Sequence, residues 1–181
     1  MGIEKHRERS QFGPQDLGIL DGPTPRAFKT IVSLCATAVA APMTTLCVFD
    51  DAASALLVRT AHGLDIGPVA SNGIPLTGSV AAFARANGRT TRICDLSEAP
   101  HDTSVEHMRF GAHAFLGSVV HGPADEPIGV LGAMHPNPHV WTYREARLVE
   151  DMAYLLSQQI MLKASFATLR IMSEERRKTS H

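Results

Sequence analysis

Residues 78–96 read GSVAAFARANGRTTRICDL, and this stretch decides the fold class. Ser79 is a typical helix N-cap, because its hydroxyl can accept a hydrogen bond from an N–H group of the first turn. Asn87-Gly88 supplies the left-handed residue at which many helices end. Residues 90–94 read TTRIC and have the β-branched content of a short strand. The stretch therefore predicts one helix followed by one short strand.

Upstream of this stretch, the pattern predicts a helix and a hairpin. Apolar residues recur every three or four positions over residues 28–39, and Thr24-Pro25 is typical of an N-cap followed by proline at the first helical position. Pro42 ends this helix. Residues 44–49 and 55–61 are β-rich runs, which we expect to pair as a hairpin.

Downstream, two residue pairs have the Thr-x-x-Glu spacing of a capping box. Thr103 and Glu106 open a short helix over residues 104–110, and Thr142 and Glu145 open a long helix that runs to about residue 173. Residues 115–120 and 128–135 are predicted strands. Hairpins that alternate with helices indicate an α+β domain whose mainly antiparallel central sheet is flanked by helices.

Composition describes one folded, nearly neutral domain. The chain has 181 residues, of which 44% are hydrophobic and 19% charged, with a formal net charge of -1. These values exclude a disordered chain and argue against a nucleic-acid binder or a protein drawn to anionic lipid. Cys35, Cys47 and Cys94 form no CxxC pair, so neither a disulfide scaffold nor a zinc site is expected.

We expect a cytoplasmic protein, because the three sparse cysteines fit a reducing compartment and no apolar run is long enough for a signal peptide or a membrane span. Gly, Pro and charged residues predict a flexible leader over residues 1–23. The folded domain is predicted over residues 24–163. Residues 164–181 are predicted to extend the last helix or to form a linker.

Three groups of residues resemble the GAF domain family over about residues 24–163. The helix of residues 78–89 followed by Ile93-Cys94-Asp95-Leu96 is similar to the family's glycine-initiated helix and its short strand ending in aspartate. The paired strands FLGSVV (115–120) and IGVL (128–131) are similar to two strands of the family, and Trp141-Thr142 with Glu145 precedes the last helix as in its members. A PAS-like domain is the alternative, since it is also an antiparallel sheet flanked by helices.

This resemblance implies a sensory domain of the broad branch found in bacterial sensor kinases, cyclases and transcription regulators. The chain lacks the Asn-Lys-Phe-Asp-Glu signature of the cyclic-nucleotide branch, and residues 95–113 lack the cysteine that a bilin-binding branch needs. Its cysteines do not reproduce the spacing of the free methionine sulfoxide reductases of this fold. We therefore expect a binding domain that is not itself an enzyme, and the sequence identifies no cofactor.

The resemblance also implies a ligand pocket between one face of the sheet and residues 74–115. The predicted ligand-binding residues are Gly78, Ser79, Asp95, Asp102, His107, Arg109 and His113. His101, His107 and His113 are spaced by six, which places them on different faces of a helix, so solvated histidines are favoured over metal ligands.

Three of these assignments have a structural alternative. Arg109, with Arg92, suits a bidentate contact to an anion or an ordinary surface ion pair. Gly78-Ser79 suits an anion at a helix N-terminus or only a tight turn. A redox role for Cys94 is weighed against an inert, partly buried thiol.

The last helix carries two apolar stripes. Val149, Ala153 and Leu156 begin one that should cover the domain's own sheet. The second has leucines every seven residues, and its predicted dimer-interface residues are Leu148, Met152, Leu155, Leu162, Phe166 and Leu169. We expect a parallel homodimer through this seam, in which Gln159 weakens the contact and fixes its register. An intramolecular contact with the first helix or the leader is the alternative.

The leading functional hypothesis is a homodimeric sensory domain that binds an unidentified small molecule and binds neither nucleic acid nor membrane. Its output partner would be a histidine kinase or cyclase domain, to which Arg176-Arg177-Lys178 could begin a linker. Two alternatives come from other classes. One is a small enzyme similar to the free methionine sulfoxide reductases, and the other is a purely structural dimerisation domain.

Overall fold

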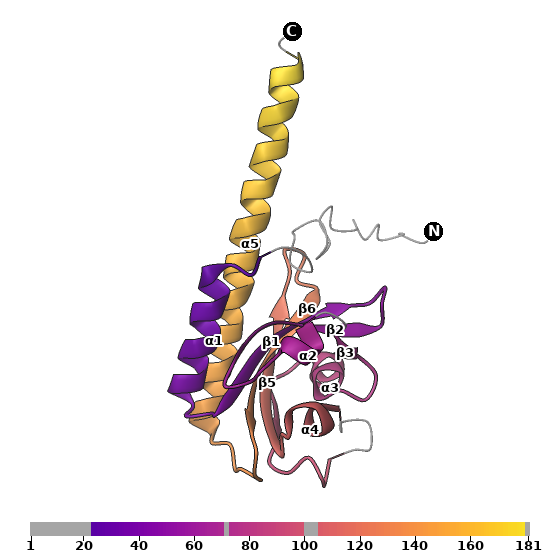
Figure 1. Ribbon diagram of the computed structural model, residues 1–181. Helices are drawn as coiled ribbons and strands as arrows, with labels where there is room; N and C mark the ends of the chain where they lie inside the picture. The colour runs from indigo at the N-terminus through magenta and orange to yellow at the C-terminus, as the bar shows by residue number, and fades with distance from the viewer. Residues whose placement is uncertain (1–22, 71–72, 100–104, 180–181) are drawn as a thin grey trace, which may run out of the picture.

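The computed structural model describes residues 23–70, 73–99 and 105–179. In chain order the elements, drawn in Figure 1, are α1 (Arg26–Ala38), β1 (Met43–Asp50), β2 (Ala55–His62), α2 (Gly67–Ala70), β3 (Ile74–Pro75), α3 (Val80–Asn87), β4 (Thr91–Ile93), α4 (Val105–Phe110), β5 (Ala114–His121), β6 (Pro127–His135) and α5 (Tyr143–Thr179). The strands form one sheet in the order β3-β2-β1-β6-β5-β4, and every neighbouring pair is antiparallel. The predicted α+β class and antiparallel sheet are confirmed.

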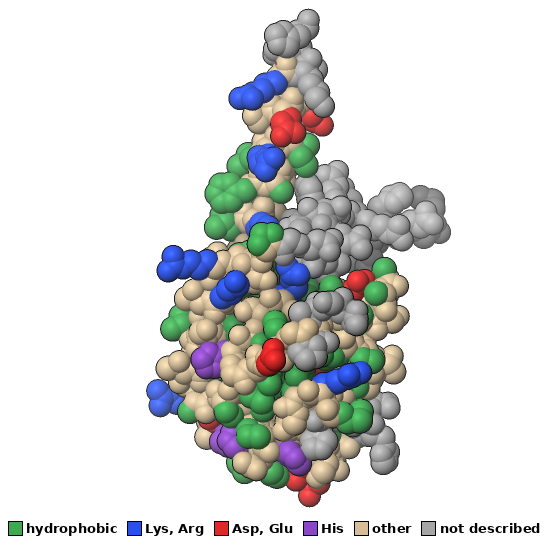
Figure 2. All heavy atoms as spheres, viewed as in Figure 1, with side chains coloured by type: hydrophobic (Ala, Val, Ile, Leu, Met, Phe, Trp, Pro, Cys, Tyr) green, Lys and Arg blue, Asp and Glu red, His purple; other side chains and the backbone are tan. Residues whose placement is uncertain are grey.

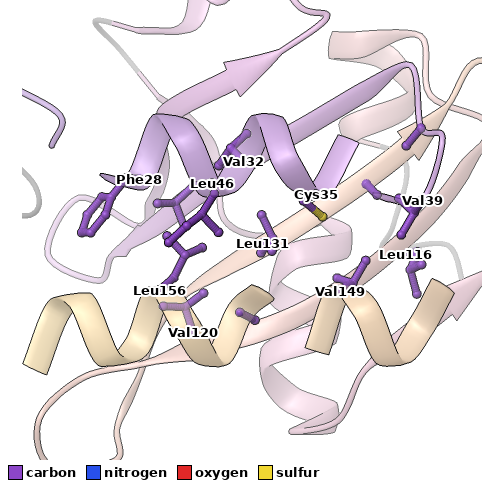
Figure 3. Packing of buried hydrophobic residues seen from close by; sticks show 14 of the residues in the cluster. Phe28, Val32, Cys35, Val39, Leu46, Leu116, Val120, Leu131, Val149 and Leu156 are labelled. Carbon is purple, nitrogen blue, oxygen red and sulfur yellow. The ribbon is translucent and has the colours of Figure 1, made fainter. Parts of the chain in front are cut away.

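Helices α1 and α5 lie side by side on one face of the sheet. Figure 3 shows Val32 and Cys35 of α1 and Leu156 of α5 pointing toward Leu131 of the sheet. These side chains are almost fully buried, and so is Leu46 of β1. The stripe that was predicted to cover the sheet does so, because Val149, Ala153, Leu156 and Ile160 all belong to this core cluster.

The opposite face of the sheet is covered by α3 and α4 and has its own core. Successive residues of a strand point to opposite faces, so Leu46 and Val48 belong to the α1/α5 cluster while Cys47 and Phe49 belong to the second cluster. Val80 and Ala84 of α3, together with Met134 of β6, also pack in this second cluster. Both faces of the sheet are thus buried, which is why residues 46–49 of β1 (LCVF) form an unbroken apolar run.

Several helix signals act as the sequence predicts. The Ser79 hydroxyl accepts a hydrogen bond from the Ala82 N–H at 3.0 Å, and Gly88 ends α3 in the left-handed conformation at φ 64°. At α5, the Glu145 carboxylate accepts from the Thr142 N–H, while the Thr142 hydroxyl accepts from the Glu145 N–H. These bonds join neighbours three residues apart and need no tertiary partner.

Other local predictions are wrong, and for Thr24 the reason is that its hydroxyl hydrogen-bonds to a residue distant in the sequence. The Thr24 hydroxyl does not cap α1; it donates to the Arg59 carbonyl on β2 at 2.8 Å, and Pro25 is the N-cap residue instead. Helix α1 ends at Ala38, four residues before Pro42, and Ala40 takes a positive φ of 48°. The short helix α2 was not predicted. Thr103 lies outside the described residues. Its expected partner Glu106 instead accepts hydrogen bonds from the backbone of α3.

Helix α5 is longer than predicted and reaches Thr179. Its first half packs on the sheet, and its second half extends beyond the body of the domain (Figure 1). None of the helices within the described residues is long and apolar enough to span a membrane.

Candidate functional site

The N-terminus of α3 lies at the edge of the second core. Gly78 has a φ of 78°, a conformation that side chains disfavour, so this glycine makes the tight turn into the helix. The Ser79 hydroxyl donates to the Leu76 carbonyl at 2.7 Å and accepts from Ala82. The N–H groups of Val80 and Ala81 still need acceptors, because the first turn of a helix has none within the helix.

Glu106 of α4 supplies both acceptors. Its carboxylate accepts from the Val80 N–H at 2.8 Å and from the Ala81 N–H at 3.2 Å. The Val105 N–H donates to the Gly78 carbonyl at 3.1 Å, so α4 is fastened to the start of α3 at two adjacent residues. The side chain sits at the positive end of the α3 dipole. The chain's own carboxylate thus occupies the anion position that was predicted at Gly78-Ser79.

Glu106 is only 3% exposed. Burial raises the pKa of its carboxyl group above the ordinary value, and the hydrogen bonds from the two α3 N–H groups partly oppose that rise. A buried carboxylate is costly unless hydrogen bonds hold it. Glu106 is therefore a buried hydrogen-bond acceptor beside a hydrophobic core.

Beside this carboxylate lies a small cavity, which we call the niche. Its lining residues are Thr45, Cys47, Ala81, Glu106, Phe110, Phe115, Val130, Gly132 and Met134. The niche has a volume of about 10 Å³, enough for roughly one water molecule. It lies on the sheet face that α3 and α4 cover, within the segment where the resemblance places a ligand pocket.

Two glycines make room for the Phe115 ring in the niche. A Cβ atom on Gly132 would lie 2.8 Å from the Phe115 ring, and one on Gly117 would also collide with it. The ring is buried and lies over these two positions of β5 and β6. The absence of side chains at Gly117 and Gly132 therefore sets where the aromatic wall lies.

Thr45 and Cys47 are alternate residues of β1 and contribute the remaining polar atoms. The Cys47 thiol lies 3.6 Å from the Thr45 hydroxyl oxygen. Burial raises the pKa of the Cys47 thiol to about 12. Since the thiolate is the reactive form, this cysteine is a poor nucleophile near neutral pH. Cys94, in contrast, is exposed, so its predicted partial burial is wrong.

Comparison with known proteins now identifies the family. The model of the GAF domain family matches residues 24–160. This chain belongs to the GAF family. Among curated proteins, none matches the sequence.

Solved structures share the fold at low sequence identity. The GAF domain of a phosphoenolpyruvate-protein phosphotransferase from Coxiella burnetii is 17% identical with a TM-score of 0.65, over 85% of this chain and 91% of that chain. A free methionine-R-sulfoxide reductase from Neisseria meningitidis, in complex with its substrate, is 17% identical with a TM-score of 0.63, over 85% and 88%. A domain assigned to a sensor histidine kinase of Sinorhizobium meliloti 1021 is 14% identical with a TM-score of 0.61, over 79% and 94%.

Of the seven residues predicted to contact a ligand in this GAF domain, the five whose side chains or backbone the structure fully describes do not line the niche. Gly78 and Ser79 form the turn into α3. Asp95 accepts hydrogen bonds from the backbone and hydroxyl of Ser97, and the backbone of His113 bonds to Leu96 and His135. Arg109 is exposed on α4. Asp102 lies outside the described residues, and so does the side chain of His107.

No group of three or more His, Cys, Asp or Glu side chains in the described parts of the chain could hold a metal ion. A larger hollow of about 470 Å³ lies beside α5 and the β5–β6 turn. It is open to solvent and lined partly by charged side chains, and its Arg147 is already paired with Glu150 and Asp151. The niche is the better candidate site, because it is buried and combines an apolar wall with the carboxyl group of Glu106.

The predicted dimer residues on α5 fall into two groups. Leu148 and Met152 are half-buried and pack against the domain's own core. The other four remain exposed: Leu155 by 47%, Leu162 by 50%, Phe166 by 60% and Leu169 by 61%. Figure 2 shows hydrophobic side chains gathered on the part of α5 that extends beyond the domain. We call these four residues the α5 seam.

Sequence reasoning missed the residues that line the niche. Thr45, Cys47 and Met134 lie on strands that are apolar on both faces, so alternation alone does not say which side chains meet a cavity. Glu106 looked like a local cap, since the residue three positions before it is a threonine. Its partners at Val80 and Ala81 are separated from it by the whole of α3, β4 and the following loop, a relation that no local pattern contains.

Proposed function

We propose that this GAF domain is a sensory module that binds a small molecule in the niche and acts as a homodimer through α5. The carrying observation is the buried Glu106 carboxylate beside an aromatic-walled cavity on the face that α3 and α4 cover. GAF domains are generally regulatory, and the raised pKa of Cys47 disfavours thiol catalysis at this position.

A ligand in the niche requires α4 to move. The cavity of about 10 Å³ is far smaller than the roughly 300 Å³ at which ligand pockets begin. Phe110 at the end of α4 lines it, and Glu106 fastens the same helix to α3. A ligand therefore binds the open arrangement of α4 better than the closed one, and it shifts the population toward that arrangement.

The α5 seam supports the dimer part of the proposal. Fully burying a leucine or phenylalanine side chain contributes about 1.5–3 kcal/mol, so each half-exposed residue of the seam would contribute roughly 1 kcal/mol in a dimer. Next to the seam, Ile31 of α1 and Gln159 of α5 line a shallow groove with Leu155. A second copy of α5 would cover both the seam and this groove.

We place the domain in the cytoplasm and upstream of a histidine kinase or cyclase output domain. The fold neighbour assigned to a sensor histidine kinase supports this context. In this proposal, residues 24–163 are the binding domain, residues 1–23 are a leader, and residues 164–181 extend α5 as a linker. A conformational change in the binding domain would then be transmitted through α5 to the output domain.

Native mass spectrometry of the purified chain tests both parts. We expect a dimer, and a bound small molecule that is lost when the protein unfolds. Leu155→Glu and Leu162→Glu should each give monomers, because a charge cannot be buried in the seam without a partner. Tyr154→Glu is the control, since Tyr154 is also an exposed apolar residue of α5 but does not belong to the seam. A dimer that survives both leucine changes contradicts the seam assignment.

A further inference from the structure

We infer that the niche selects small aromatic molecules that carry an amine or another hydrogen-bond donor, and that Glu106 is the residue that receives the donor. This inference rests on the proposed function and adds the chemical class of the ligand. It differs from one of the two sequence-based interpretations, in which Gly78-Ser79 and Arg109 contact an anion rather than forming a tight turn and a surface ion pair. The charge, the hydrogen-bond capacity and the shape of the niche support it.

Charge favours a donor. Of the nine residues that line the niche, Glu106 is the only carboxylic acid and none is a cation. Among the nearby arginines, Arg85 is bound to Asp51 through both ends of its guanidinium group, at 2.6 and 2.9 Å, and Arg109 is exposed. An anionic guest would therefore lie beside a buried carboxylate with no cation to offset it, which is unfavourable at low dielectric. An ammonium group would instead neutralise that carboxylate.

Hydrogen-bond capacity points the same way. An ionised carboxylate offers about four acceptor positions, and the α3 N–H groups of Val80 and Ala81 use one on each oxygen. A donor on the guest can therefore bond to one of the two remaining acceptor positions of Glu106. An anion that sought the same N–H groups would first have to displace the Glu106 carboxylate from them.

Shape selects a flat apolar body. Phe110 comes from α4, Phe115 from β5 and Met134 from β6, and all three line the niche. Aromatic rings and a thioether are favourable neighbours for another aromatic ring. The remaining polar atoms, on Thr45 and Cys47, are within 3.6 Å of each other and already interact. One ring with one donor therefore matches the chemistry of the lining.

Benzylamine and benzoate test this inference, because they share a ring and carry opposite charges at neutral pH. The full chain, labelled with [methyl-13C]methionine, would be titrated with each compound and observed by NMR. The Met134 methyl group reports on the niche, and Met161 on the exposed side of α5 is the reference. We expect benzylamine to shift the Met134 signal with an affinity at least tenfold higher than that of benzoate, with Met161 unchanged.

Glu106→Gln should lower the benzylamine affinity at least tenfold and remove the difference between the two probes. Glu98→Gln is the matched control, because Glu98 is exposed and should leave the affinity unchanged. The comparison on the wild-type chain stands even if the Glu106 variant does not fold. Stronger binding of benzoate at Met134 would overturn the ligand class and leave the proposed function intact. If neither probe moved Met134, both the inference and the proposed niche would be wrong.

Discussion

Replacing Glu106 with alanine should destabilise the domain by about 2–4 kcal/mol. The change leaves the N–H groups of Val80 and Ala81 without their acceptors in a buried position. Each unsatisfied buried group costs about 1–3 kcal/mol. The sum is reduced because the variant also loses a desolvated carboxyl group, whose raised pKa shows that its charged form is disfavoured by burial. Water that enters the enlarged niche could hydrogen-bond to these N–H groups and would reduce the loss of stability further.

Urea unfolding followed by circular dichroism at pH 7 measures this change. Glu98→Ala is the control, and its exposed side chain predicts an effect within about 0.5 kcal/mol. All variants must be compared at one protein concentration, because the stability of a dimer depends on concentration. If Glu106→Ala unfolded within 0.5 kcal/mol of the control, Glu106 would not be the group that satisfies the start of α3.

Two further predictions concern the same region. Because the folded-state pKa of Glu106 is raised, the folded protein binds more protons than the unfolded one between the ordinary carboxyl pKa and the raised value. Wild type should therefore gain stability relative to Glu106→Gln as the pH falls from 7 toward about 4.5, and should lose that gain as the pH rises through the folded-state pKa. Urea titrations across this pH range would measure the difference. Equal pH profiles of the two proteins would argue against a buried carboxyl group. Gly132→Ala should cost about 1–3 kcal/mol in thermal unfolding, because its Cβ would press on the Phe115 ring at 2.8 Å; an unchanged melting temperature would mean that the ring is free to move.

The parts of the fold that follow from short-range chemistry could be predicted from the sequence. Ser79 and Gly88 bound α3 because a hydroxyl and a left-handed glycine act within one helical turn. Thr142 and Glu145 open α5 for the same reason. The apolar stripe with Leu156 was predicted to pack on the sheet, because an amphipathic helix buries its apolar face, and Leu156 is buried. Leu162 belongs to a second apolar face of the same helix, and that face is exposed in the single chain.

The site could not be predicted in the same way, because its decisive contacts join distant residues. Thr24 bonds to Arg59, and Glu106 bonds to Val80 and Ala81, although both side chains have a local capping role in the sequence pattern. A buried acceptor at low dielectric gains more from two orphan N–H groups than from a solvated turn. The sequence therefore placed Glu106 in the segment expected to border a pocket but contained no local signal for its bonds to α3.

In the proposed function, a small molecule enters beneath α4 and is held by Glu106. A crystal structure of the chain with benzylamine tests it most directly. We predict the ring between Phe110 and Phe115, the nitrogen within hydrogen-bond distance of the Glu106 carboxylate, and α4 displaced from its closed position. An amine bound only in the open hollow beside Arg147, with Phe110 still closing the niche, would contradict the account.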